Sequence, residues 1–233
     1  MSRFLLLLPL CLFALIIACS KDDADDSPPQ ADVDPATLLE RSADAVQEAG
    51  TFHFNLTHQN GTTPLPLNLQ LVSAEGDFEV PGRLAAEVRA RAAGGINVSV
   101  DIIAIDDQTW ITNPFTRDWQ RLPGASLRDL ADPGTLVTTL LPLVMNPTVS
   151  DGGEVDGVET LRVEGTIDSG ELREALSFAR PGHTVRVEAW IGEEDSLPRR
   201  MRLTGALVSD EDEDVVRQID LTNFGDPVQI DPP

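Results

Sequence analysis

Cys19 is the side chain whose setting points most clearly to chemistry, because a cysteine sulfur is a nucleophile that can be acylated. It follows a basic Arg3, an almost uninterrupted apolar run over residues 4–17, and the small residue Ala18. A basic start, an apolar centre too short to span a bilayer comfortably and a small residue before the cut are typical of a secretory signal peptide. The sequence therefore predicts export, with residues 1–18 removed.

The four residues 16–19 resemble the bacterial lipobox, whose cysteine becomes the first residue of the mature protein and is acylated on sulfur. The resemblance implies that Cys19 carries a diacylglyceryl group and holds the protein on the extracytoplasmic face of the cell membrane. Each buried methylene of a chain such as palmitate contributes about 0.8 kcal/mol, so two or three chains anchor firmly. The alternatives are an ordinary cleaved signal with a chance cysteine and an uncleaved anchor helix.

Recognised catalytic motifs are missing from the sequence, which has no G-x-S-x-G, no phosphate-binding loop and no H-E-x-x-H. The histidines His53, His58 and His183 have no cysteine or close third ligand beside them, which disfavours a metal site. The acidic run 209–214 lacks the spaced ligands of a calcium loop, so a solvated hairpin tip is favoured there. We predict a protein that is not an enzyme and that uses no cofactor or metal ion.

The charge balance is strongly acidic, with 39 Asp and Glu against 17 Lys and Arg and a formal net charge of −22. This disfavours nucleic acid as a partner, and it disfavours adhesion to anionic headgroups. The cluster 199–202 would place Arg200 and Arg202 on one face of a strand, suited to a lipid phosphate or a sugar acid. Pairing of these arginines with nearby acids is the favoured interpretation.

The composition divides the chain into three segments. Residues 1–18 are the signal peptide, and residues 19–34, rich in Asp, Pro and Ser, are expected to form a flexible acidic tether. Residues 35–233 are long enough for one domain with its own core. Cys11 is lost with the signal, so this domain has no disulfide and depends on apolar packing.

The domain is expected to open with a helix and to continue as an antiparallel meander. Asp34 is a candidate N-cap before Pro35, and Gly50 suits the end of the helix. Alternating apolar runs predict strands at 52–56, 65–71, 78–80, 84–92, 96–102, 109–112, 158–167, 185–191, 201–203 and 215–221, with 228–230 as a candidate edge. Helical crossovers between strand pairs are missing, which argues against a parallel sheet.

Two further helices are expected, and the first of them has an unusual composition. The stretch from Leu136 to Val144 has helical spacing, a break near Pro142 and no charged residue, so it is either fully buried or lines an apolar space. A short helix after Asp168 carries Leu172 and two further apolar positions. These helices are the candidates to cover the apolar face of the sheet.

Scattered motifs now resemble a known family in collinear order over about residues 36–233. They are Leu38-Leu39, Thr51-Phe52-His53-Phe54, Gly76-Asp77, Trp110-Ile111-Thr112-Asn113-Pro114, Val155-Asp156-Gly157-Val158, Val163-Glu164-Gly165-Thr166, Val187-Glu188-Ala189-Trp190-Ile191 and Phe224-Gly225-Asp226-Pro227-Val228. The pattern is similar to the LppX/LprA/LprF/LprG lipoproteins. The acidic run 209–214 is particular to this chain.

The resemblance implies an α+β fold, similar to that of the LolA/LolB lipoprotein carriers. A strongly curved antiparallel sheet would form a half barrel, with helices packed on its concave face around an apolar cavity. It also implies binding of lipids or lipoglycans and help in their transport across the envelope. The implied partners are lipid or glycolipid acyl chains and the membrane, and an envelope lipid transporter is a further candidate.

For such a carrier we expect six side chains at the cavity wall, namely Phe52, Phe54, Leu136, Leu140, Leu141 and Val144. The main alternative is an envelope adaptor with the same sheet but a filled core, which docks through a sheet edge or through the acidic run. An envelope hydrolase is the third hypothesis, and the sequence offers no nucleophile and base for it.

Overall fold

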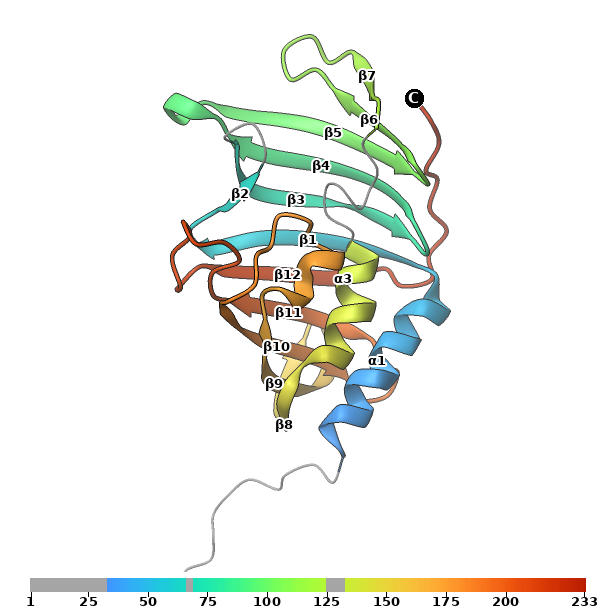
Figure 1. Ribbon diagram of the computed structural model, residues 1–233. Helices are drawn as coiled ribbons and strands as arrows, with labels where there is room; N and C mark the ends of the chain where they lie inside the picture. Colours follow the sequence, from blue (N-terminus) through green and yellow to red (C-terminus); the bar gives the residue numbers. More distant parts are fainter. Residues whose placement is uncertain (1–32, 66–68, 125–132) are drawn as a thin grey trace, which may run out of the picture.

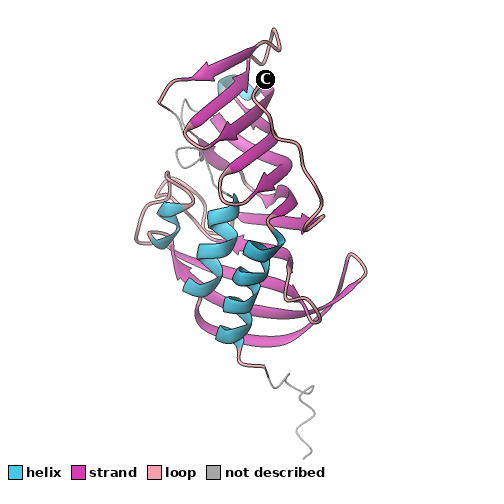
Figure 2. Ribbon diagram, turned by 90° about the vertical axis from the view of Figure 1, so that its right-hand side faces the viewer, coloured by secondary structure: helices cyan, strands magenta, loops and turns pink. Residues whose placement is uncertain are grey.

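The computed structural model describes residues 33–65, 69–124 and 133–233, and these form one curved sheet with helices on one side (Figures 1 and 2). The sheet has twelve strands in the order β7-β6-β5-β4-β3-β1-β12-β11-β10-β9-β8, and β2 pairs with β3. Every strand pairing among the described residues is antiparallel. The predicted antiparallel, curved α+β fold is confirmed.

The strands fall into two halves that meet where β1 pairs with β12. The first half contains β1 (Thr51–Asn60), β2 (Thr63–Leu65), β3 (Leu69–Glu79), β4 (Arg83–Arg91), β5 (Asn97–Ile105), β6 (Gln108–Thr112) and β7 (Trp119–Leu122). The second half contains β8 (Met145–Val155), β9 (Val158–Asp168), β10 (Thr184–Gly192), β11 (Pro198–Thr204) and β12 (Val216–Thr222). The chain thus builds outward from the centre to one edge and then inward from the other edge.

Helix α1 (Pro35–Ala49) has both of the ends that the sequence predicts. The Asp34 carboxylate accepts a hydrogen bond from the Thr37 backbone N–H at 2.8 Å, which satisfies a free donor of the first turn. Gly50, with φ of 74°, donates its backbone N–H to the Val46 carbonyl. The left-handed φ explains why glycine stands at this position.

The apolar stretch near residue 140 forms α3 (Pro133–Leu140) and then the 3-10 turn η3 (Leu141–Leu143). Pro142 lacks a backbone donor, which accounts for the change of helix type. The short helix expected after Asp168 is only the 3-10 turn η4 (Glu171–Glu174), so that prediction was too long. A further 3-10 turn, η2 (Ala93–Gly95), connects β4 to β5.

The two α-helices lie side by side and cover the half of the sheet that contains β12 to β8, together with β1 (Figures 1 and 2). Their apolar side chains and the inner face of these strands form the core, including Leu38, Leu39, Val46, Leu140, Leu141, Val163, Val187, Met201 and Leu203. In both views the strands β4 to β7 extend beyond the helices. The inner face of β4 to β7 is therefore largely left uncovered by α1 and α3.

The structure corrects the strand prediction at three places. Gly76 is not a break but lies inside β3, where a Cβ would be 2.1 Å from the Ala85 carbonyl oxygen of β4. The sequence did not predict the edge strands β7 and β8, because both are largely exposed and lack an alternating apolar pattern. Strand β8 also contains Pro147 and two glycines, which edge strands tolerate. Residues 228–230, by contrast, do not form a strand.

Gly134 offers a test of how closely α3 packs against the sheet. An added Cβ would lie 2.2 Å from Phe78 Cε1, and Phe78 is fully buried and stacked on Phe52 at 5.3 Å. We expect Gly134→Ala to lower the free energy of unfolding by about 1–3 kcal/mol in urea titrations. The control is Gly82→Ala, where a Cβ meets nothing within 4 Å. Equal stability of the two variants would contradict this packing.

Candidate functional site

An apolar cavity of about 330 Å³ lies against the concave side of the sheet, next to the first turns of α3. Its volume rises to about 1710 Å³ when the space at its open side is included. Side chains from β1 to β7, α3, the segment after η4, β11 and β12 line it, and all of them except Thr63, Ser177 and Arg217 are apolar. Both its size and its composition are within the range of ligand pockets.

Small side chains on the inner face keep this space open. The inward positions of β4 include Ala86, Val88 and Ala90, and Val98 and Val100 stand on the neighbouring β5. Protein interiors are otherwise packed at nearly crystalline density, so leucine or phenylalanine at these positions would fill much of the volume. The cavity is therefore encoded by side-chain size as well as by polarity.

A β-bulge in β3 turns additional leucines toward the cavity. The register with β4 shifts between Leu71 and Ser73, so Leu69 and Leu71 before the shift and Ala74 after it all line the cavity. Strict alternation would place odd-numbered and even-numbered residues on opposite faces. The sequence predicted Leu69 and Leu71 as one face of a strand, but it gave no indication of the bulge.

Two of the six side chains predicted at the wall, Phe54 and Leu136, line the cavity. The other four, Phe52, Leu140, Leu141 and Val144, are buried in the core and are not part of the lining. Phe52 stacks on a neighbouring ring, and Leu140 and Leu141 belong to the helical segment that packs with α1. Val144 follows that segment and lies against Gly165 of β9. Contact of any of the six with a ligand stays a prediction.

Arg217 is a charged side chain inside this apolar lining, and its side chain is only 3% exposed. Its guanidinium forms an ion pair with Glu211, whose side chain is 2% exposed. Nε donates to the Thr63 hydroxyl at 2.7 Å, and Nη1 donates to the Gly205 carbonyl at 2.9 Å. These contacts fix the 205–215 segment against the end of β12.

His58 extends this polar cluster on the neighbouring strand β1. It contacts the Val72 carbonyl through Nδ1 at 2.9 Å and the Thr63 hydroxyl through Nε2 at 2.8 Å. Burial, and to a smaller degree the positive charge of Arg217, lower the pKa of His58 below its ordinary value, although the Val72 carbonyl and Glu211 act in the opposite direction. The neutral imidazole therefore donates to Val72 and accepts from Thr63.

Burial also lowers the pKa of Arg217 below its ordinary value, while the adjacent Glu211 opposes that change. An arginine nevertheless remains protonated in proteins. Arg217 thus lines the apolar space as one member of a compensated ion pair with Glu211, and Thr63 and the neutral His58 complete the cluster. Sequence patterns missed this cluster because 209–214 was expected to be a solvated tip, whereas Glu211 points inward.

The basic cluster 199–202 behaves as the favoured interpretation predicted. Arg200 contacts Asp220 at 2.5 Å, and Arg202 contacts Gln218 at 3.0 Å and Glu188 at 3.9 Å. These side chains alternate with the buried Met201 and therefore lie on the face of the sheet opposite the core. Their charges are already used in pairs, so they do not form a free anion site.

Two classes of site are not found in the described segments. No group of three or more His, Cys, Asp or Glu side chains there could hold a metal ion. His53 and His58 do not converge, because His53 contacts Asp77 at 2.8 Å while His58 belongs to the buried cluster. In the same part of the chain, no helix combines the length and the apolar character that a membrane span requires.

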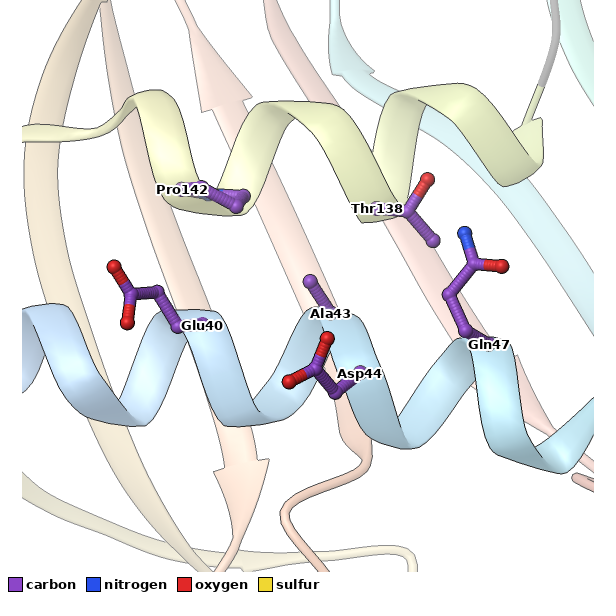
Figure 3. Close-up of a pocket in the computed structure, with 6 residues that line it drawn as sticks. All are labelled: Glu40, Ala43, Asp44, Gln47, Thr138 and Pro142. Carbon is purple, nitrogen blue, oxygen red and sulfur yellow. The ribbon is translucent and has the colours of Figure 1, made fainter.

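A second depression of about 330 Å³ lies between the two helices (Figure 3). Glu40, Ala43, Asp44 and Gln47 of α1 contribute to it, together with Thr138 of α3 and Pro142 of η3. Its lining is mostly polar, and Glu40, Asp44 and Gln47 are exposed. It lacks the enclosed apolar surface that would favour a hydrocarbon ligand, so the cavity under the sheet is the stronger candidate.

The family model described as "LppX_LprAFG lipoprotein" matches residues 34–230 of this chain. The chain belongs to this lipoprotein family. The family resemblance inferred from the scattered motifs is thereby confirmed. Cys19, the residue predicted to be lipidated, lies outside the described residues, and so do residues 1–18 and most of the predicted tether 19–34.

Relatives in mycobacteria support the same assignment. Proteins of Mycobacterium bovis and Mycobacterium tuberculosis named "Putative diacylated glycolipid transporter LprF" are 23% identical over 240 residues, which cover 98% of this chain and 90% of theirs. The crystal structure of LprF from M. bovis matches with a TM-score of 0.64 at 20% identity, over 85% of this chain and 96% of that one.

The crystal structure of the M. tuberculosis lipoprotein LppX matches with a TM-score of 0.58 at 21% identity, over 85% of this chain and all of that one. At this level of identity, the two structural matches establish that the fold is shared.

The state of His58 predicts how stability depends on pH. Its folded pKa is lowered, so below about pH 6.5 the unfolded chain binds a proton that the folded chain resists, and this contribution to stability falls with the pH. Urea unfolding between about pH 7.5 and pH 5.5 should therefore show a smaller loss of stability for His58→Gln than for the natural chain. Titration of the carboxylates changes the free energy of unfolding of both proteins alike, so it cancels in the comparison. If the free energy of unfolding of the two proteins depended on pH in the same way, the proposed effect of His58 would be ruled out.

Proposed function

We propose that this protein is a membrane-anchored lipoprotein on the extracytoplasmic side, which binds the acyl chains of a lipid or lipoglycan and assists their transport across the cell envelope. The observation that carries the proposal is the cavity, whose lining is apolar at all but three side chains. Exposed hydrocarbon costs about 25 cal/mol per Å² in water, so a lipid tail gains strongly by entering such a space. Acyl chains need no hydrogen bonds, which suits a wall made of sheet leucines, valines and alanines.

The relatives support the same class of ligand. LprF is named as a transporter of a diacylated glycolipid, and this chain aligns with it over nearly its whole length. The proposal extends that ligand class to this chain because the chain shares the fold of LprF and has an apolar cavity on the concave side of its own sheet. Neither the direction of transport nor an envelope transporter as partner is needed for the binding step itself.

Lipidation of Cys19 supplies the membrane attachment in this proposal. The predicted tether of residues 19–34 spans at most roughly 55 Å when fully extended. This length would let the domain reach outward from the bilayer surface while it remains attached. The strongly acidic chain would be repelled by anionic headgroups, so the covalent lipid is required for attachment.

The adaptor hypothesis requires a filled core, and the cavity argues against it. A fully interlocked interior would leave no apolar volume of this size between the sheet and the covering segments. The proposal involves no catalytic step.

Blocking the cavity tests the binding step. Val100 lines it from β5, and Ile103 stands on the opposite face of the same strand, so Val100→Trp and Ile103→Trp form a matched pair. Lipid extracted from the full chain after expression in a bacterial host, counted per protein by mass spectrometry, should fall roughly tenfold for Val100→Trp only. Equal lipid content in both variants, with folding intact, would refute cavity binding.

The anchor is tested separately at Cys19. Mass spectrometry of the membrane-extracted chain should show a diacylglyceryl adduct on Cys19, and Cys19→Ser should remove both the adduct and the firm attachment to membranes. The control is Cys11→Ser, which changes the other cysteine and should leave the adduct intact. An unmodified Cys19 in the natural protein would refute the anchor while leaving the cavity proposal standing.

A further inference from the structure

The charged side chain in the cavity lining is Arg217, and together with its neighbour Thr63 it makes this end of the cavity polar. The guanidinium has five N–H groups, of which three are donated to Thr63, Gly205 and Glu211. Within the described segments, no acceptor is found for the other two. A lipid that displaced water from the cavity without offering an oxygen atom would leave these donors unsatisfied, at a substantial cost in affinity.

The central strand pair arranges this polar end and an apolar track in one line. Arg217 stands opposite His58, Ile219 opposite Leu56, and Leu221 opposite Phe54 in the pairing of β12 with β1. Successive pairs on one face of a sheet are two residues apart and follow each other along the strands. An extended acyl chain that follows Ile219 and Leu221 would therefore bring its polar end to Arg217.

The charge of the cluster determines which kind of polar end fits. The positive charge of Arg217 is already compensated by Glu211 in an ion pair, and His58 and Thr63 are neutral. A ligand carboxylate at this place would be repelled by Glu211, and the positive charge of Arg217 is already paired with Glu211. Burial of the ligand carboxylate would therefore be unfavourable. An uncharged carbonyl oxygen can accept a hydrogen bond without that penalty.

We infer that Arg217 is a specificity-determining residue that donates a hydrogen bond to an ester carbonyl of the bound lipid, so that the cavity selects esterified acyl chains over free fatty acids and plain hydrocarbons. This inference rests on the proposed function, because it concerns the ligand of the same cavity. It adds a defined orientation, with the ester at Arg217 and the chain along β12 and β1.

The test uses methyl palmitate, palmitate and hexadecane as probes, with the full chain delipidated and held in amphipol, and with protein-free amphipol as the blank. Methyl palmitate labelled with ¹³C at its carbonyl should show an infrared stretch at lower frequency than in a hydrocarbon solvent, as a hydrogen-bonded carbonyl does. At about pH 9, where palmitate is ionised, methyl palmitate should bind roughly tenfold or more tightly than palmitate.

The variant is Arg217→Met combined with Glu211→Gln, which removes both charges together and retains a side-chain oxygen for the Leu207 N–H that Glu211 binds at 2.7 Å. It should lose the carbonyl shift and bind methyl palmitate roughly tenfold more weakly. The matched control is Arg200→Met with Asp220→Asn, an ion pair between β11 and β12 on the opposite face of the sheet. The control should keep both the shift and the affinity.

Each outcome separates this inference from the proposal on which it rests. If none of the probes binds the natural chain, the proposed function fails. If methyl palmitate binds but its carbonyl frequency equals that in hydrocarbon, or if palmitate binds as tightly, the role of Arg217 is wrong and the carrier function stands. Because the carbonyl frequency is measured on the natural chain, a double variant that does not fold would not prevent this decision.

Discussion

The concave face of the sheet carries more apolar surface than the two α-helices can cover. Helix α1 has 15 residues and is about 22 Å long, and α3 is only 8 residues long, so together they cover β1 and the strands from β12 to β8. The remaining inner face from β4 to β7 holds side chains such as Val88 and Val100 beside an open volume. Apolar surface left toward water carries a continuing free-energy cost, which a hydrocarbon ligand removes.

Because the helices cover only part of the apolar face of the sheet, one half of the domain has an ordinary packed core and the other half does not. Under the helices, Val163, Val187 and Met201 are almost completely buried. On the other side of the β1–β12 pairing, most inward positions of β4 and β5 are small or only partly buried, with Leu84 as an exception. Stability is therefore concentrated in the helix-covered half, and the cavity can stay hollow because the rest of the fold does not depend on filling it.

The buried Arg217–Glu211 pair has a different effect from that of the apolar wall. Removing two charges from water is costly, and attraction between them offsets the cost only when hydrogen bonds satisfy the remaining groups. Here Thr63, Gly205 and the Leu207 N–H supply such bonds. The pair therefore fixes one arrangement of the 205–215 segment at the end of the cavity.

Much of this fold could be predicted from the sequence, because its local signals agree. The caps of α1, the break near Pro142 and most strands followed from residue type and spacing. The contents of the site were harder to predict, since Phe52 and Phe54 share the inner face of β1 and only tertiary packing separates core from cavity. The alternation of apolar and polar residues does not reveal the bulge in β3. It also gives no sign that Glu211, within an acidic run, points inward.

The meeting of β1 with β12 at the centre of the sheet has a consequence for how the chain assembles. Each half is built from hairpins between neighbours in sequence, whereas the seam joins partners as distant as His53 and Thr222. Closing so long a loop is entropically expensive, so this seam should be the slow, final step of folding. A chain that emerges from its amino end would present β1 with one unpaired edge until its last strand arrives, so that edge stays open to other strands for the whole of synthesis.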